Sequence, residues 1–112
     1  MQDNHISYIE FKTTDMQKSK EFYSNAFGWK FKDYGEECAS FSESGVHGGF
    51  VLSKDDIING VLVVLYHNEL EKIRDKVKEE GGEITMDIFA FPGGRRFQFL
   101  DPSGNELAIW SE

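Results

Sequence analysis

The sequence predicts an α+β fold built from two successive βαβββ modules. The predicted elements run strand, helix and three strands, and the same series then follows again. An offset of 54 residues places Met16 on Leu70. The length of 112 residues suits one domain. We therefore expect a single domain over residues 1–112, with modules at about residues 5–53 and 60–111.

The first helix is expected after the segment KTTD. Thr14 with Gln17 fits a capping box, in which each side chain bonds the other residue's free backbone amide. Gly28 is a natural end for this helix. Between these signals, apolar residues fall close to helical spacing at Met16, Phe22, Tyr23, Ala26 and Phe27.

The second helix is expected to begin near Asn68, with Glu71 three residues further on. The pair Gly81–Gly82 would end it. Its apolar stripe consists of Leu70, Ile73 and Val77.

Eight strands account for the remaining apolar segments. In ELAIW, alternation puts Leu107 and Ile109 on one face and Glu106, Ala108 and Trp110 on the other. GVLVVLYH is apolar on both faces, which favours a central strand. In chain order the predicted strands are HISYIEF, WKFKDY, CASFS, HGGFVLS, GVLVVLYH, EITMDI, RFQFL and ELAIW.

Charge and hydropathy exclude several classes of partner. The net charge is −8, and no basic cluster is larger than Arg95–Arg96, so nucleic-acid binding is not expected. No apolar run approaches the roughly 20 residues of a membrane span. The start MQDNHIS is polar and has no apolar run, so no signal peptide is expected. A single cysteine allows no intrachain disulfide, and we expect a cytoplasmic protein.

Three stretches carry a family resemblance. YIEFKTTDMQKSKEFYSNAFGWKF has a strand, a helix and an FY…GW turn, LEKIRDKVKEEGGEI has a second helix, and FPGGRRFQFLDPSGNELAIW has a DP-x-GN hairpin. Together they resemble the vicinal oxygen chelate superfamily, which includes glyoxalase I, bleomycin-resistance proteins, fosfomycin-resistance enzymes and extradiol dioxygenases. The resemblance implies that the modules curl into a half-open barrel of mixed sheet, with helices outside and a cavity inside. It also implies a homodimer.

The resemblance further implies four metal-ligand positions, which fall on Tyr8, Gly49, Leu62 and Ala108. Only the tyrosine has a donor atom, and a phenol with a pKa of about 10 is a poor ligand. We therefore expect a small glyoxalase-like member without the family metal and without another cofactor.

An alternative metal site remains open beside these positions. His47 and Glu106 each precede a vacated ligand position by two residues. Strand alternation is expected to turn Glu10 toward the cavity as well. One histidine and two carboxylates can hold a divalent ion with open positions. Otherwise Glu10 and Glu106 would be satisfied by water or by neighbouring lysine and arginine side chains.

The expected cavity mixes aromatic and polar side chains, which suits a small, partly aromatic or polar organic molecule. The face on which Arg96 lies stays open: in the cavity it favours an anion such as a carboxylate, and at a strand start it is an ordinary surface residue. The predicted ligand-binding residues are Tyr8, Glu10, His47, Tyr66, Arg96, Gln98, Glu106 and Trp110.

Three functions fit these residues, and the sequence leaves catalysis open. The favoured one is a metal-free binding protein, like the drug-sequestering members of the family. The second is a lyase, isomerase or dioxygenase-type enzyme, using a metal on His47, Glu10 and Glu106 or using Glu10 or Glu106 as an acid–base group. The third is a dimeric interaction module whose aromatic side chains fill the cavity.

Overall fold

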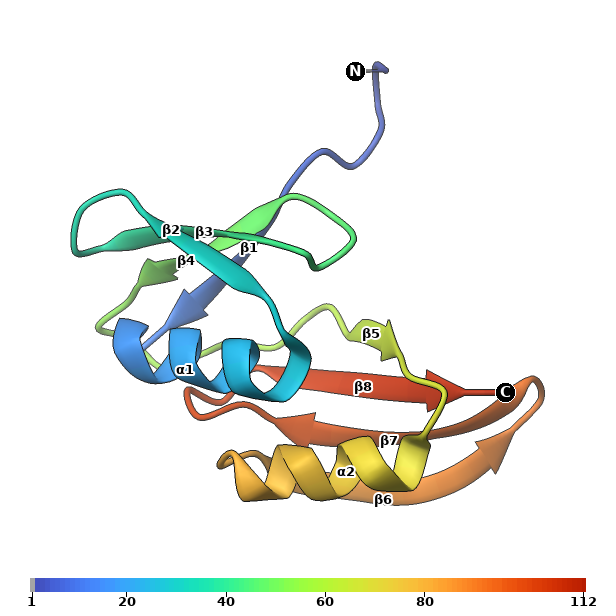
Figure 1. Ribbon diagram of the computed structural model, residues 1–112. Helices are drawn as coiled ribbons and strands as arrows, with labels where there is room; N and C mark the ends of the chain where they lie inside the picture. The colour runs from blue at the N-terminus through green and yellow to red at the C-terminus, as the bar shows by residue number, and fades with distance from the viewer. Residues whose placement is uncertain (1) are drawn as a thin grey trace. The chain divides into compact units, whose positions relative to one another are not determined.

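The computed structural model describes residues 2–112 and has the predicted order of elements (Figure 1). The chain divides into two compact units, one that ends at Asp56 and one that begins at Ile57. Each unit contains one four-stranded mixed sheet, with the strand orders β1-β4-β3-β2 and β5-β8-β7-β6. The α+β fold of two βαβββ modules, with curled and unclosed sheets, is confirmed.

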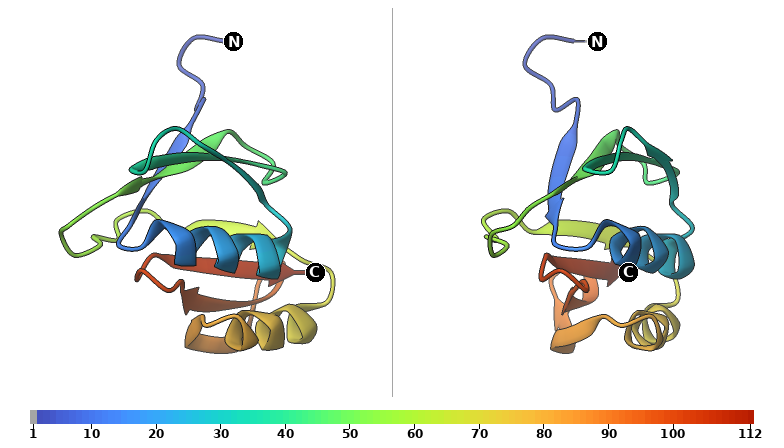
Figure 2. Two further views of the ribbon diagram at one scale, coloured as in Figure 1. Left: turned by 60° about the vertical axis from the view of Figure 1, so that its left-hand side comes forward. Right: turned by 90° about the vertical axis from the view of Figure 1, so that its left-hand side faces the viewer.

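In the first unit, β1 pairs in parallel with β4, and the β4–β3 and β3–β2 pairs are antiparallel. Helix α1 packs against one face of this sheet (Figure 2). Its side chains meet an aromatic core, in which the ring centroids of Tyr23 and Trp29 lie 4.7 Å apart and those of Phe11 and Phe50 lie 5.3 Å apart. The elements are β1 (Ile9–Thr13), α1 (Met16–Phe27), β2 (Lys30–Asp33), β3 (Cys38–Ser42) and β4 (Gly48–Leu52).

The start of α1 differs from the prediction. Its N-cap is Asp15, whose carboxylate accepts a hydrogen bond from the Lys18 backbone N–H at 3.1 Å. The helix therefore begins one residue later than a Thr14–Gln17 capping box requires, and that prediction is wrong. Gly28 ends the helix as expected, with a left-handed φ of 76°.

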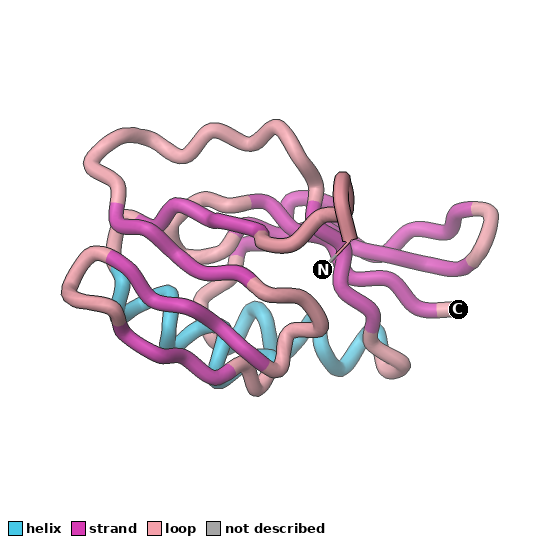
Figure 3. The backbone as a smooth tube through the Cα atoms, turned by 90° about the horizontal axis from the view of Figure 1, so that it is seen from above, coloured by secondary structure: helices cyan, strands magenta, loops and turns pink. Residues whose placement is uncertain are grey.

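In the second unit, β5 pairs in parallel with β8, and the β8–β7 and β7–β6 pairs are antiparallel. The predicted stripe of α2 is confirmed, because Leu70, Ile73 and Val77 are its buried residues. Strands β6 and β7 form a long hairpin (Figure 3). The elements are β5 (Val63–Tyr66), α2 (Leu70–Glu79), β6 (Glu83–Phe91), β7 (Gly94–Leu100) and β8 (Glu106–Ser111).

Strand β5 lies at an edge of this sheet, so the prediction of a central strand is wrong. Val64 and Tyr66 are 44% and 52% exposed, while Val63 and Leu65 alternate with them. The segment is apolar on both faces because Val64 and Tyr66 lie on the face turned away from α2, which is itself partly apolar. An apolar run of this kind does not need a central position.

The start of α2 also differs in detail. The helix begins at Leu70, and the side chain of its N-cap residue Glu69 accepts no hydrogen bond from the first-turn backbone N–H groups. Instead, the Glu69 backbone N–H donates to His67 Nδ1 at 3.0 Å, so the cap expected at Asn68 is absent. The expected stop is confirmed, since the Gly82 backbone N–H donates to the Val77 carbonyl at 2.8 Å.

Within residues 2–112, neither helix is long and apolar enough to cross a membrane.

Candidate functional site

The far face of the second sheet, meaning the face turned away from α2, carries the larger group of predicted binding residues. Leu107 and Ile109 are 0% and 1% exposed and belong to the core on the α2 side. The alternating residues of β8 therefore lie on the far face, as alternation in ELAIW predicts. These residues are Glu106, Ala108 and Trp110.

Strand register assembles a row of side chains across this face. Residues that pair directly on neighbouring strands have side chains on the same face of the sheet. Trp110 pairs with both Tyr66 and Arg96, and Arg96 pairs in turn with Phe89. This set is called the aromatic–arginine row below: Tyr66, Trp110, Arg96 and Phe89. The adjacent row is Val64, Ala108, Gln98 and Met86.

The two neighbouring arginines point to opposite faces, which resolves the question that the sequence leaves open. Arg95 forms two hydrogen bonds, of 2.9 and 3.0 Å, to the carboxylate of Glu71 on α2. This hydrogen bonding holds the pKa of Glu71 below its usual value. Arg96 is half-buried on the far face beside Trp110. Arg95 thus lies on the α2 side, and Arg96 lies on the far face.

Arg96 lies among aromatic rings rather than carboxylates. Its guanidinium carbon is 5.3 Å from the Phe89 ring centroid and 5.7 Å from that of Phe91. Its Nη2 donates to Gln98 Oε1 over a long 3.5 Å. Its Nε is buried and has no hydrogen-bond partner among the described residues.

Glu106 lines a small pocket of about 200 Å³ at the start of β8. Its carboxylate accepts a hydrogen bond from Thr85 Oγ1 at 2.9 Å, and its backbone N–H donates to Asn59 Oδ1 at 3.0 Å. The other residues that line this pocket are Asn59, Gly60, Val61 and Leu62. One vacated ligand position, Leu62, therefore lies beside a carboxylate.

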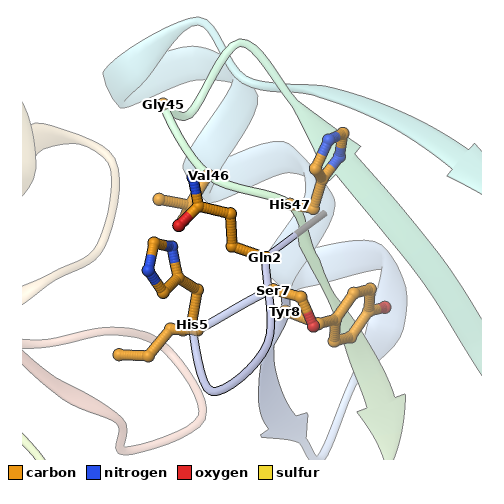
Figure 4. Close-up of a pocket in the computed structure, with 8 residues that line it drawn as sticks. Gln2, His5, Ser7, Tyr8, Gly45, Val46 and His47 are labelled. Carbon is orange, nitrogen blue, oxygen red and sulfur yellow. The ribbon is translucent and has the colours of Figure 1, made fainter.

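The first unit has its own pocket of about 410 Å³ between the N-terminal segment and the loop before β4 (Figure 4). It contains two of the predicted binding residues, Tyr8 and His47. The His5 and His47 imidazoles point in different directions, so they do not converge on one point. The lining residues are Gln2, His5, Ile6, Ser7, Tyr8, Gly45, Val46 and His47.

Gly49, another vacated ligand position, has no room for a side chain. A Cβ built there would collide with the Tyr8 hydroxyl and with the Ala39 carbonyl oxygen. The phenol thus occupies the space into which a ligand side chain at position 49 would extend. Glu10, whose register partner is Gly49, forms a 3.0 Å ion pair with Lys12, as one of the sequence alternatives expects.

These donor groups do not suit the family metal. A phenol, a glycine, a leucine and a methyl group offer one weak donor in all. Within residues 2–112, no group of three or more His, Cys, Asp or Glu residues is placed to hold a metal ion. The alternative set takes His47 and Glu10 from the first unit and Glu106 from the second, and it stays a prediction.

The sequence reading missed Phe89, Phe91 and Thr85, all on β6. Register shifts between Ile84 and Met86 and between Met86 and Phe89 break the alternation of this strand. A period-two pattern therefore cannot assign faces along it. The one available signal was the cluster of aromatic residues next to Pro92 and Gly93.

Paired βαβββ units, each with a parallel first and last strand and a helix on one face, define the glyoxalase type of fold. Residues 5–109 match the family described as the Glyoxalase/Bleomycin resistance protein/Dioxygenase superfamily, and the chain belongs to it.

Solved structures with the same fold include a family enzyme from Burkholderia phytofirmans PsJN. Its TM-score is 0.83 at 15% identity, and the match covers 94% of this chain and 96% of that one. TnmS3, an antibiotic binding protein from Streptomyces sp. CB03234, gives a TM-score of 0.74 at 20% identity, with 99% and 98% of the two chains covered. At these identities the likeness shows the fold alone.

A sequence relative is CFP32 of Mycobacterium bovis, which bears a glyoxylase name. It is 25% identical over 120 residues, and the match covers 93% of this chain. The match covers 44% of CFP32, so the chain spans less than half the length of this relative.

Proposed function

We propose that this protein binds a small, partly aromatic organic molecule on the far face of the second sheet, without the family metal. The observation that carries the proposal is the aromatic–arginine row, which presents three aromatic side chains and a half-buried cation beside Ala108, where the family resemblance implies a ligand position. Such a mixture of aromatic surface and few polar groups is typical of small-molecule sites. TnmS3, similar in fold, is an antibiotic binding protein by name.

Exposure supports binding over the alternative of a cavity filled by its own aromatic side chains. Tyr66 is 52% exposed, Val64 44% and Met86 48%, and all three belong to the two rows of the far face. Tyr66 and Val64 are neighbours on the edge strand β5, whereas Met86 lies on the opposite edge strand β6, and Ala108 between Val64 and Met86 is buried. Exposed apolar side chains on one face commonly mark a contact site. A ligand that covers them would gain about 25 cal/mol for each Å² of apolar surface buried.

The direct test is calorimetric titration of chelator-treated protein with a panel of neutral and charged bicyclic aromatic compounds. We expect at least one compound to bind equally well before and after divalent ions are added. Trp110→Ala should weaken that binding at least about tenfold, because it removes the central ring of the row. Tyr34→Ala is the matched control, since Tyr34 is an exposed aromatic residue of the first unit.

Binding that appears only when a divalent ion is present would overturn the metal-free part of the proposal. Equal binding by wild type and Trp110→Ala would remove the far face as its location. Failure of the whole panel to bind would leave the filled interaction module as the better reading.

A second candidate function is acid–base catalysis by Glu106, favoured by its place in a pocket with a hydroxyl donor at 2.9 Å. A positioned carboxylate of this kind can take a proton from a bound substrate. The conservative change Glu106→Gln should abolish turnover of any substrate found while leaving its binding within a few-fold. Unchanged turnover would exclude this carboxylate. Glu10 is the parallel candidate in the first unit, and Glu10→Gln tests it in the same way.

The alternative metal site has an independent test in thermal melting of metal-stripped protein with Ni²⁺, Zn²⁺, Mn²⁺, Co²⁺ or Fe²⁺. A native-state site at one hundred times its dissociation constant adds about 2.7 kcal/mol. For a domain of this size the midpoint would rise by roughly 10 °C. A rise for one metal that disappears in His47→Ala would establish the site, and no rise with any metal would support metal-free binding.

We also propose that the protein works as a homodimer in the cytoplasm, with a small molecule as its partner and without nucleic acid. Light scattering after gel filtration tests the dimer, since it separates a mass of twice 12.8 kDa from the monomer mass. The net charge of −8 supports the exclusion of nucleic acid.

A further inference from the structure

We propose that the molecule bound on the far face is an aromatic carboxylate and that Arg96 is the residue that binds its carboxylate. This inference rests on the proposed function and narrows it to one class of ligand. It assigns Arg96 a specific role, whereas the proposed function names no charge on the ligand and no partner for the cation.

The first argument is that Arg96 has few hydrogen-bond acceptors and no ion-pair partner among the described residues. A guanidinium has five N–H donors, and this one makes a single long hydrogen bond, from Nη2 to Gln98. Its buried Nε has no partner, and within residues 2–112 no carboxylate forms an ion pair with it. Every other described arginine has such a partner, since Arg74 pairs with Asp87 and Arg95 pairs with Glu71.

The buried Nε is closed to a ligand, so an anion would have to bind at the terminal nitrogens, of which only Nη2 makes a hydrogen bond among the described residues, over a long 3.5 Å. A cation with so few acceptors favours a ligand that supplies them. A carboxylate supplies two oxygen atoms in the plane that matches the edge of a guanidinium. A single carbonyl oxygen would satisfy fewer of these donors and would leave the positive charge uncompensated.

The second argument is that the cation is held in place before a ligand arrives. The Phe89 and Phe91 rings lie 5.3 and 5.7 Å from its guanidinium carbon, within the range of cation–π contacts. Gln98 bonds it on one side. Less side-chain freedom is therefore lost when an anion binds.

The third argument is the aromatic surface directly beside the cation. Trp110 pairs with Arg96 on the next strand, and neighbouring strands lie roughly 5 Å apart. The Tyr66 ring meets the Trp110 ring edge-on at a centroid distance of 5.1 Å. A ring that packs on these two side chains would place a carboxylate attached to it within reach of Arg96.

Acidic residues on this face do not cancel the cation. Register places Glu83 and Glu106 level with Leu100, four residues along β7 from Arg96. Four residues of strand span roughly 13 Å, and among the described residues neither carboxylate forms an ion pair with Arg96. Glu112 follows the end of β8, and it forms no ion pair with Arg96.

The test uses 2-naphthoate and its neutral analogue 2-naphthamide with the intact chain. Calorimetry gives both affinities, and the Arg96 Nε–H signal in a ¹H–¹⁵N spectrum reports contact with the cation. We expect naphthoate to bind at least about tenfold more tightly, as charge-assisted hydrogen bonds imply, and to shift that signal. Arg96→Gln should abolish the preference. Arg95→Gln is the matched control, because it removes a neighbouring arginine from the opposite face.

Arg96→Lys keeps the positive charge but removes the planar guanidinium. We expect this variant to prefer naphthoate more than Arg96→Gln does and less than the wild type does. Equal affinities for naphthoate and naphthamide in the wild type, both lost in Trp110→Ala, would overturn the carboxylate proposal and leave the proposed function standing. A naphthoate preference that survives in Arg96→Gln would assign the anion to another residue and would also overturn it. If neither compound binds at millimolar concentration, the inference fails together with aromatic binding on this face.

Discussion

The two units share one strand order but differ in the face on which most of their aromatic side chains lie. In the first unit the rings lie between α1 and the sheet, where Phe22, Tyr23, Trp29, Phe41 and Phe50 are all at most 7% exposed. In the second unit, α2 packs with Leu70, Ile73 and Val77, and the core contains Phe97 and Phe99. The other rings of that unit are Tyr66, Phe89, Phe91 and Trp110.

This difference separates aromatic residues that stabilise the fold from aromatic residues that the core does not contain. Most rings of the first unit pack in the core beside α1, so folding accounts for them, whereas Tyr8 and Tyr34 are exposed. The second unit completes its core with aliphatic residues and two phenylalanines, and its aromatic–arginine row lies outside that core. Comparing the two units therefore identifies the aromatic side chains that lie outside the core and that fold stability does not explain.

The largest expected effect is the loss of an aromatic ring from the core of the first unit. Phe50 is 1% exposed and contacts four other rings, so Phe50→Ala should cost about 3–5 kcal/mol of unfolding free energy. Trp110→Ala, from the half-buried far face, should cost about half as much or less. Urea denaturation of both variants checks this, and equal costs would contradict the contrast between the faces.

Next in size is the turn that connects β7 to β8 and sets their register. Asp101 is 4% exposed, and its Oδ1 accepts hydrogen bonds of 2.9 Å from the backbone N–H groups of Ser103, Gly104 and Asn105. Asp101→Ala leaves these donors without that acceptor and should cost about 2 kcal/mol or more. It should also weaken ligand binding, because this register aligns Arg96 with Trp110.

Asp75→Ala is the control for this variant, since that carboxylate is exposed and makes only a 3.5 Å contact with Arg74. Its unfolding free energy should be close to that of the wild type. An Asp101→Ala protein as stable as this control would show that the turn does not hold the register.

A smaller effect is expected where the two units correspond most closely. Gly49 pairs with Glu10 in the first unit, and Ala108 pairs with Val64 in the second, so the two positions are equivalent. A Cβ is present at Ala108, but at Gly49 it would collide with the Tyr8 hydroxyl and a backbone carbonyl. Gly49→Ala should therefore cost about 1–3 kcal/mol in thermal or urea unfolding.

Combining Gly49→Ala with Tyr8→Ala should recover part of that loss, because one of the two obstructing groups is then absent. If Gly49→Ala alone were as stable as the wild type, the phenol would not be fixed over this position. The equivalence of the two units would then extend to their far faces.

The repeated order of elements was predictable because it depends on local signals. Helical spacing in Phe22 and Tyr23, the stop at Gly28 and the alternation in ELAIW each act over a few residues. Helix starts were less accurate, because neighbouring side chains compete for the same backbone N–H groups. Asp15 outcompeted Thr14, and His67 acts where Asn68 was expected.

The site was predictable only in part, because register joins residues that are distant in sequence. The side on which Arg96 lies follows from its pairing with Trp110, which no local pattern contains. Phe89 joins the row only because two irregularities shift β6 along β7. The prediction that β5 is a central strand was wrong for the same reason, because its place at the edge depends on the order of the strands in the sheet.

The smallest expected effect concerns the arginine that faces the other way. Hydrogen bonding from Arg95 lowers the pKa of Glu71 below 4.5, so the pair contributes stability above the pKa of the unfolded chain and loses it as pH falls through the folded value. The contribution is small because both side chains are exposed, at 43% and 57%. A carbon-detected NMR titration should show the Glu71 carboxylate titrating below 4.5 in the wild type and at a higher pH in Arg95→Gln, because the largest cause of the lowered pKa is then absent. Arg96→Gln should leave this titration unchanged, because Arg96 lies on the far face. A shift of Glu71 in Arg96→Gln would mean that the two arginines are coupled, and the opposite roles assigned to them would fail.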